Sequence, residues 1–400
     1  AQPDNTMIRY RISAWTADGT EAYADWPELK ATTESAALKF FQGEDDFDFP
    51  PIGETHGTIF SIHVDTYTLP DWAKKAIMYQ VFIDRFYPGD DNDWLQTEDI
   101  RGFYGGTLWG VRDKLDYITD LGVNVIWLSP TFASPSHHGY DTIDYKKTEP
   151  RMGGDAALKA LIDAAHARGI KVLLDVACNH LSNEHPYFLD ALNNPDSLYR
   201  EWFTFDDSEI GYKTFFNVPT MPMVNTHSEA VREYMYGMAQ YWIREFGVDG
   251  FRLDHANGPG SHFWPGFRKA CREANPEAII FGEIVEAPNI LRTYAGRLDG
   301  LLDFSTEDAL RKHYIYGTLS KDELDRFLTF NSQYYPDDFY MPTFLDNHDM
   351  NRFLFMVKGD TDTLKAAAQH QFTLRGAPII YYGTEVGLSQ NTDSQSGAGL

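Results

Sequence analysis

Eight short apolar runs constrain the fold of this chain more than any other feature of its sequence. They occupy residues 76–83 (AIMYQVFI), 123–129 (VNVIWLS), 170–177 (IKVLLDVA), 250–254 (GFRLD), 278–283 (AIIFGE), 300–304 (GLLDF), 341–345 (MPTFL) and 378–382 (PIIYY). Segments with helical periodicity lie between these runs, and several end on glycine, which helix C-termini favour. Continuous apolar strands alternating with amphipathic helices are typical of a parallel sheet covered by helices. Eight such units predict an α/β fold, a (β/α)8 TIM barrel, in preference to an open doubly wound sheet.

The rest of the chain divides around this barrel. Alternating apolar and polar residues predict a half-buried antiparallel β module over residues 1–72. The barrel is expected over residues 73–180 and 228–390. Between its two parts, residues 181–227 are rich in Pro, Asn, Asp and aromatic residues and are too long for an ordinary loop, which predicts a small inserted domain after the third strand. Residues 391–400 are expected to be a polar tail.

Charge and composition exclude some classes of partner. The chain has 59 acidic residues against 34 Lys and Arg, a formal charge of −25, which repels polyanions such as nucleic acid. The same charge suits a neutral ligand, and it equally suits an acidic surface that keeps a protein in solution. Because the chain has no run of about 18 apolar residues, no membrane partner is expected. The acidic charge favours a secreted location over a cytoplasmic one. Cys178 and Cys271 lie in apolar segments far apart and are predicted to be buried thiols.

Polar residues gather where the predicted strands end. They are Asp175, Asn179 and His180 at the third strand, Arg252 and Asp254 at the fourth, Glu283 at the fifth, Asn347, His348 and Asp349 after the seventh, and His138, Tyr140 and Asp141 in the loop after the second. In a parallel barrel these ends meet at one mouth, where the chemistry takes place. Taken singly, each residue is as well explained as a helix cap or a loop contact. Together, several carboxylates at one mouth predict an active site.

The charges within GFRLD suggest how such a site works. Arg252 and Asp254 are two residues apart on a strand, so both side chains point to the same side, and the arginine is expected to keep Asp254 ionised. Glu283 follows the apolar run AIIF, and burial there is expected to raise its pKa. One ionised and one protonated carboxyl are the pair that retaining glycoside hydrolysis uses, as nucleophile and as acid/base.

Four motifs in this chain resemble those of α-amylase-family retaining glycoside hydrolases. They are DVACNH (175–180), GFRLDHA (250–256), FGE (281–283) and FLDNHD (344–349), and they occur in the same order as in the family. The resemblance implies that Asp254 is the nucleophile, Glu283 the general acid/base and Asp349 the third catalytic carboxylate. It also implies a set of sugar-binding residues, namely Arg252, His180, His348, Tyr140, Asp141, His138 and Asn347.

The resemblance extends to the domain organisation. Residues 181–227 are similar to the family's domain B, and MPMVN (221–225) within them is similar to the MPKLN motif of neopullulanases, cyclomaltodextrinases and maltogenic amylases. The N-terminal β module points to the same relatives. The family's C-terminal β domain has no counterpart in this chain, so the resemblance implies a piece of a longer enzyme.

Calcium is the one cofactor that the resemblance implies, and no organic cofactor is expected. Asn179 matches a calcium-binding asparagine of the family, but Asn257 and Gly258 stand where many α-amylases have a Lys-His pair that contributes to the calcium site. A second candidate is the segment PGDDNDW, which offers hard oxygen ligands of the kind that calcium prefers. Its ligands would be Asp90, Asp91, Asn92 and Asp93. The segment is equally compatible with a solvated acidic loop.

The function expected from these residues is retaining hydrolysis of α-1,4-glucosidic bonds in starch, maltooligosaccharides, cyclodextrins or pullulan. An α-glucan transglycosylase is the alternative, because a sugar hydroxyl can replace water as the acceptor. A non-catalytic carbohydrate-binding barrel is disfavoured, because none of the three carboxylates is missing. In each case the partner is an α-glucan, and the oligomeric state stays open.

Overall fold

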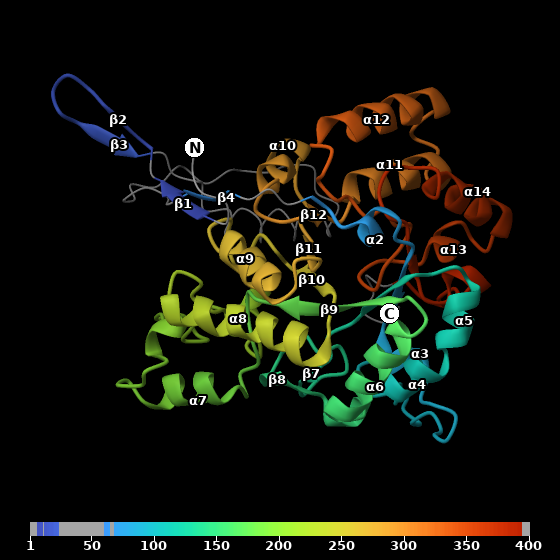
Figure 1. The fold of residues 1–400 in the computed structure, drawn as a ribbon, viewed down its shortest axis with the longest axis horizontal. Coiled ribbons are helices and arrows are strands. Elements are labelled where there is room, and N and C mark those ends of the chain that lie inside the picture. The colour runs from blue at the N-terminus through green and yellow to red at the C-terminus, as the bar shows by residue number, and fades with distance from the viewer. Residues whose placement is uncertain (1–5, 11, 24–59, 65–67, 394–400) are drawn as a thin grey trace.

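The computed structural model describes residues 6–10, 12–23, 60–64 and 68–393, with a curved parallel sheet at its centre (Figure 1). The strands of this sheet are β5 (Met78–Val81), β6 (Val125–Leu128), β9 (Lys171–Ala177), β10 (Gly250–Asp254), β11 (Ile279–Gly282), β12 (Gly300–Leu301) and β13 (Ile379–Tyr381). They pair in the order β12-β11-β10-β9-β6-β5-β13. Every pairing is parallel. Seven of the predicted strands therefore form one parallel sheet.

The predicted seventh strand, MPTFL, closes this sheet without forming a regular strand. Tyr340 makes a parallel bridge to Gly300 of β12, and Thr343 makes one to Pro378 beside β13. The prediction of a regular strand here is wrong, because Pro342 has no N–H to donate and the pairing is reduced to isolated bridges. These bridges still join the two edges of the sheet, so the prediction of a (β/α)8 TIM barrel is confirmed.

Successive side chains on the strands alternate between two apolar layers. One buried cluster fills the barrel and includes Met78, Val125, Trp127, Leu173, Ile279, Phe281 and Ile379. The other lies between the strands and the helices and includes Val81, Ile126, Leu128, Val172, Leu174, Phe251, Leu253 and Ile280. This period of two is the pattern of a pleated strand. On β10 it sends Phe251 and Leu253 toward the helices, and therefore turns Arg252 and Asp254 into the barrel.

Helices surround the sheet (Figure 1). They are α2 (Asp71–Lys74), α3 (Ile83–Phe86), α4 (Leu108–Asp113), α5 (Leu115–Asp120), α6 (Gly154–His166), α7 (Pro186–Asn193), α8 (Glu229–Tyr241), α9 (Trp264–Ala274), α10 (Pro288–Leu291), α11 (Phe304–Tyr314), α12 (Lys321–Tyr334), α13 (Phe353–Met356) and α14 (Thr361–Gln371). A π-helical turn, Trp242–Phe246, extends α8 and ends at Gly247, whose φ of 79° suits a glycine. The helices complete the covered parallel sheet that the apolar runs predict.

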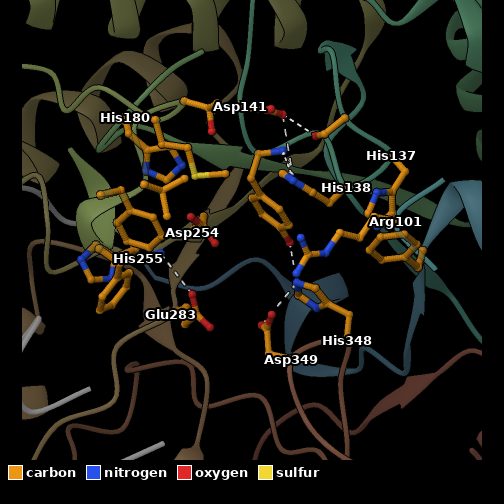
Figure 2. A pocket seen from close by; sticks show the side chains of 18 of the residues that line it. Arg101, His137, His138, Asp141, His180, Asp254, His255, Glu283, His348 and Asp349 are labelled. Carbon is orange, nitrogen blue, oxygen red and sulfur yellow. Dashed lines mark hydrogen bonds and ion pairs between the residues drawn. The ribbon is translucent and has the colours of Figure 1, made fainter. Parts of the chain in front are cut away.

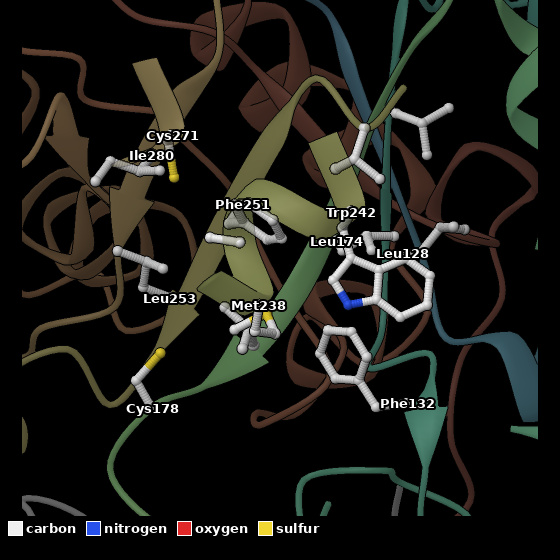
Figure 3. Close-up of a cluster of buried hydrophobic side chains, with 14 of the residues drawn as sticks. Leu128, Phe132, Leu174, Cys178, Met238, Trp242, Phe251, Leu253, Cys271 and Ile280 are labelled. Carbon is white, nitrogen blue, oxygen red and sulfur yellow. The ribbon is translucent and has the colours of Figure 1, made fainter. Parts of the chain in front are cut away.

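Both cysteines lie in the layer between strands and helices (Figure 3). Cys178 and Cys271 are free and fully buried, which confirms the prediction of buried thiols. Burial raises the pKa of both thiols. They therefore act as small apolar side chains and not as nucleophiles.

The excursion after β9 is held together by short pairings. It contains α7 and four isolated antiparallel bridges, among them one between His180 and Met223 that ties it to the end of β9. Its aromatic residues pack on one another, as in the stacked rings of Tyr187 and Tyr199 with centroids 3.9 Å apart. The excursion lies at the C-terminal side of the barrel strands, where it forms part of a cavity wall.

At the N-terminal end, two small antiparallel sheets are described. In one, β1 (Thr6–Tyr10) pairs with β4 (Phe60–Val64), and in the other β2 (Ser13–Trp15) pairs with β3 (Glu21–Tyr23). Residues 24–59 of the predicted β module and the predicted tail from residue 394 lie outside the described residues. The domain boundaries given above stay predictions. Within the described ranges, no helix is both long enough and apolar enough to cross a bilayer.

Candidate active site

A single buried arginine organises the mouth of the barrel. Arg252 is fully buried on β10 and stands in register with Asp175 on β9. Its Nη1 donates to Asp175 Oδ1 at 2.8 Å and to Asp254 Oδ1 at 3.0 Å. Its Nη2 lies 2.9 Å from Glu283 Oε2. One guanidinium is thus shared among three carboxylates from three adjacent strands.

The three predicted catalytic carboxyls face one cavity of about 850 Å³ (Figure 2). Asp254 ends β10, Glu283 follows β11 directly, and Asp349 lies in the loop after the bridging segment at 340–343. The parallel strands bring them together because their C-terminal ends meet at the same side of the barrel. The structure therefore assembles residues that are up to 95 positions apart in sequence.

A second hydrogen-bonded chain reaches the same arginine through Asp175. Tyr140 Oη donates to Asp175 Oδ2 at 3.0 Å and lies 2.6 Å from His348 Nε2. The other nitrogen of His348, Nδ1, lies 2.7 Å from Nε2 of Gln80 on β5. Burial lowers the pKa of His348 to about 4, so the ring is neutral near pH 7. No role for Gln80 was predicted from the sequence, although it is a polar residue within the apolar run AIMYQVFI.

The ionisation of the carboxyls differs from the prediction. Burial raises the pKa of Asp254 well above its usual value, and the lowering by Arg252 does not offset it. Burial also acts to raise the pKa of Glu283, but Arg252 and the backbone N–H of His255 lower it overall. Burial and the charge of Glu283 raise the pKa of Asp349 to about 7. These shifts run in the opposite direction to the prediction of an ionised Asp254 beside a protonated Glu283, because Arg252 also contacts Glu283 and Asp175.

The remaining predicted sugar-binding residues divide into two groups. His138, Tyr140, Asp141 and His180 line the cavity. His180 stacks on Phe215 with centroids 4.4 Å apart, and burial lowers its pKa to about 3. Asn347 is buried but does not line the cavity, and its Oδ1 accepts a hydrogen bond of 2.8 Å from the Asp349 backbone N–H. Asn347 therefore supports the backbone of Asp349.

The excursion forms one wall of the cavity, as the resemblance to domain B implies, but the residues of this wall were not predicted from the sequence. Phe216, Asn217 and His255 have φ values of 46°, 58° and 41°, a left-handed backbone that costs a non-glycine residue about 1–2 kcal/mol. Phe215 packs edge-on against His255 with centroids 4.8 Å apart, and the His255 N–H donates to Glu283 Oε2 at 3.1 Å. The aromatic content of the excursion was the only sequence signal for this wall, because backbone strain leaves no mark in a motif.

None of the metal candidates lines the cavity, although Asn179 Nδ2 lies 3.4 Å from Nδ1 of the cavity-lining His180. Asn179 Oδ1 is buried and has no hydrogen-bond partner, while Asp90, Asp91, Asn92 and Asp93 are exposed. Across the described part of the chain, no group of three or more Asp, Glu, His or Cys side chains is arranged to hold a metal ion. Calcium takes about six to eight oxygen ligands, which amide and backbone carbonyls can supply as well as carboxylates. The calcium site stays a prediction, and no step below depends on it.

The fold and the site are those of a TIM-barrel protein with carboxyl groups at the C-terminal ends of its strands. The model of the α-amylase catalytic domain matches residues 80–398. The chain therefore belongs to the α-amylase catalytic-domain family.

Curated relatives and solved structures give the neighbourhood within the family. The chain is 40% identical over 336 residues to α-amylase 2 of Dictyoglomus thermophilum, which covers 84% of this chain and 59% of the relative. It is 37% identical to neopullulanase 2 of Thermoactinomyces vulgaris, covering 82% of this chain and 59% of the relative. A cyclic α-maltosyl-(1→6)-maltose hydrolase of Arthrobacter globiformis superposes with a TM-score of 0.77 at 31% identity, covering 83% of this chain and 78% of that one. The chain spans about three fifths of the length of the curated relatives it matches.

Proposed function

We propose that this chain is the catalytic part of a retaining α-glucan hydrolase that cleaves α-1,4-glucosidic bonds. The observation that carries the proposal is the pair of carboxyls, Asp254 and Glu283, held by two nitrogens of one buried guanidinium at the mouth of a family barrel. Retaining hydrolysis needs two carboxyls on either side of one bond. The names of the relatives support an α-glucan as the substrate.

In the proposed reaction, Glu283 donates its proton to the glycosidic oxygen while Asp254 attacks the anomeric carbon. The C–O bond to the leaving sugar breaks, and a bond from the carbon to Asp254 forms. Water then attacks the same carbon as Glu283 takes a proton from it, and the carboxylate of Asp254 leaves. Each carboxyl is thus returned to its starting state.

This reaction requires a proton on Glu283, whereas the ligand-free site favours protons on Asp254 and Asp349. Hydrogen bonds to a carboxylate favour its charged form. Sugar hydroxyls that donate to Asp254 and Asp349 therefore lower the pKa of both and leave the shared proton to Glu283. Substrate binding, in this proposal, sets the protonation state that the chemistry needs.

The test is Glu283→Gln, assayed on soluble starch, pullulan, cyclodextrin and maltose. Turnover should fall by at least about 10³-fold, because no group remains to protonate the leaving oxygen, while glucan binding is retained. Glu245→Gln is the matched control, because Glu245 is exposed on the π-helical turn. Normal turnover in the Glu283 variant would reject the assignment.

Product analysis in the same assay separates water from sugar as the acceptor. Hydrolysis of maltoheptaose increases the number of reducing ends, whereas glucan transfer yields new chain lengths without that increase. A parallel assay with a chelator tests the calcium prediction. New chain lengths without new reducing ends would replace the hydrolase by a transglycosylase.

A further inference from the structure

Gln80 is a buried amide within the otherwise apolar strand β5. It is 2% exposed and stands in register with Trp127 on β6 and with Tyr381 on β13. By the alternation along β5 its side chain points into the barrel, as that of Met78 does. An amide in this layer costs free energy unless it is hydrogen-bonded, and its one described hydrogen-bond partner is His348.

The contact between Gln80 and His348 is compatible with two arrangements when taken alone. Gln80 can donate from Nε2 to an unprotonated Nδ1, or, with its amide turned over, accept from a protonated Nδ1. In the first arrangement the proton of the neutral imidazole is on Nε2, and in the second it is on Nδ1. The groups that face Nε2 of His348 therefore decide between the two tautomers.

Two neighbours of Nε2 favour a proton on this atom. Tyr140 Oη, at 2.6 Å, has a single proton, which it donates to Asp175 Oδ2 at 3.0 Å. Tyr140 Oη can then only accept from His348. Asp349 Oδ2 lies 3.3 Å from the same nitrogen, and whenever Asp349 is ionised a lone pair on Nε2 would face a carboxylate oxygen. The Tyr140 contact favours the Nε2–H tautomer in either ionisation state of Asp349, and an ionised Asp349 adds to it.

We propose that Gln80 is a positioning residue that holds His348 in its Nε2–H tautomer and so makes His348 a hydrogen-bond donor to the cavity. The chain of donors then runs in one direction, from Gln80 through His348 and Tyr140 to Asp175. Asp175 in turn anchors Arg252, which contacts Asp254 and Glu283. The inference rests on the proposed function for its effect on turnover, but the tautomer itself does not depend on any activity.

Gln80→Glu tests the proposal, because a carboxylate accepts and does not donate. It requires a proton on Nδ1, so His348 either changes tautomer or becomes a cation. The charged groups that face His348 are Arg252, Asp175, Glu283 and Asp349. In the variant, ¹⁵N NMR should show a protonated Nδ1, where the native protein shows an unprotonated one, with His348→Gln used to assign the signal. The kcat on maltooligosaccharides should fall on the order of 10- to 100-fold.

Gln80→Met is the second variant, because it removes the donor without adding an acceptor or a charge. It should give a mixture of tautomers and a smaller fall in kcat than Gln80→Glu. Gln371→Met is the control for loss of a buried amide, since Gln371 bonds two backbone carbonyls behind β13 and does not contact His348. It should leave the His348 signal unchanged.

The outcomes separate this inference from the proposed function. A protonated Nδ1 in the native protein, or an unprotonated one in Gln80→Glu, would overturn the inference. Unchanged kcat in Gln80→Glu despite the change of tautomer would also overturn it. Absence of turnover on every glucan with the expected tautomer would overturn the proposed function and leave the assignment of His348 in place.

Discussion

The two ends of the barrel use buried charges in opposite proportions. At the C-terminal mouth, the single guanidinium of Arg252 serves Asp175, Asp254 and Glu283. At the N-terminal end, two arginines, Arg268 and Arg272, serve the single carboxylate of Asp299.

A second aspartate at the N-terminal end of the barrel also contacts more than one basic side chain. Asp249, just before β10, accepts from Lys171 Nζ at 2.8 Å and from the Val172 backbone N–H at 2.9 Å, and it lies 2.7 Å from His166 Nε2. A carboxylate with such partners is a structural anchor, whereas carboxylates that outnumber their cation have unsatisfied charge available for a ligand. The number of basic partners that a carboxylate has therefore distinguishes structural anchors from reactive groups better than its burial does.

The largest expected effect is on activity at the mouth. Asp254→Asn should lower kcat/KM on glucans by about 10⁴-fold or more, because the nucleophile is lost, without destabilising the fold. Because burial raises the pKa of Asp254 well above its usual value, the amide replaces a carboxyl that favours its neutral form, and the melting temperature should stay unchanged or rise. Kinetics and thermal unfolding of the same sample measure both, and a large loss of stability would remove the distinction between the two ends.

The counterpart at the N-terminal end is Asp299→Asn. It should destabilise the protein by about 3–5 kcal/mol, because the buried Arg268 and the half-buried Arg272 both lose their ion pair with this carboxylate. Denaturant unfolding measures the loss, and the kcat of the folded fraction should stay within about twofold of the native value. If kcat fell while the free energy of unfolding stayed at the native value, Asp299 would also contribute to catalysis.

A smaller effect, on the pH dependence of stability, is expected at an ion pair that supports the mouth of the barrel. Glu307 on α11 forms an ion pair with Arg311, whose Nη2 donates at 2.9 Å to the carbonyls of both Leu345 and Asn351, on either side of the loop that carries Asp349. Burial raises the pKa of Glu307 to about 7. This anchor of the mouth therefore titrates near neutral pH.

The sign of its pH dependence follows from proton binding. A carboxyl with a raised pKa binds its proton more tightly in the folded protein than in the unfolded chain, so its contribution to stability falls as pH rises from about 4.5 to about 7. Glu307→Gln should flatten this part of the stability curve, measured by denaturant unfolding between pH 5 and 8. A slope that is the same in the variant and in the native protein would exclude Glu307 as its source.

Much of the fold and the identity of the acidic site residues could be predicted from the sequence. The period of two on the strands and the helical periods between them require a covered parallel sheet, and parallel strands place their C-terminal ends together. Asp254, Glu283 and Asp349 could therefore be assigned to one site before any distance was known. The regular strand at MPTFL failed as a prediction because a closing strand needs only a few hydrogen bonds, and Pro342 removes one of them.

The barrel and the set of residues at its mouth follow from local periodicity and strand direction, so both could be predicted from the sequence. How those residues share one arginine depends on contacts between strands, which appear only in the folded protein. The protonation of Asp254 and Glu283 depends on burial and on charges from other strands, and so it reversed the expectation drawn from neighbours in sequence. The same holds for Gln80, whose partner His348 is 268 residues away along the chain and 2.7 Å away in space.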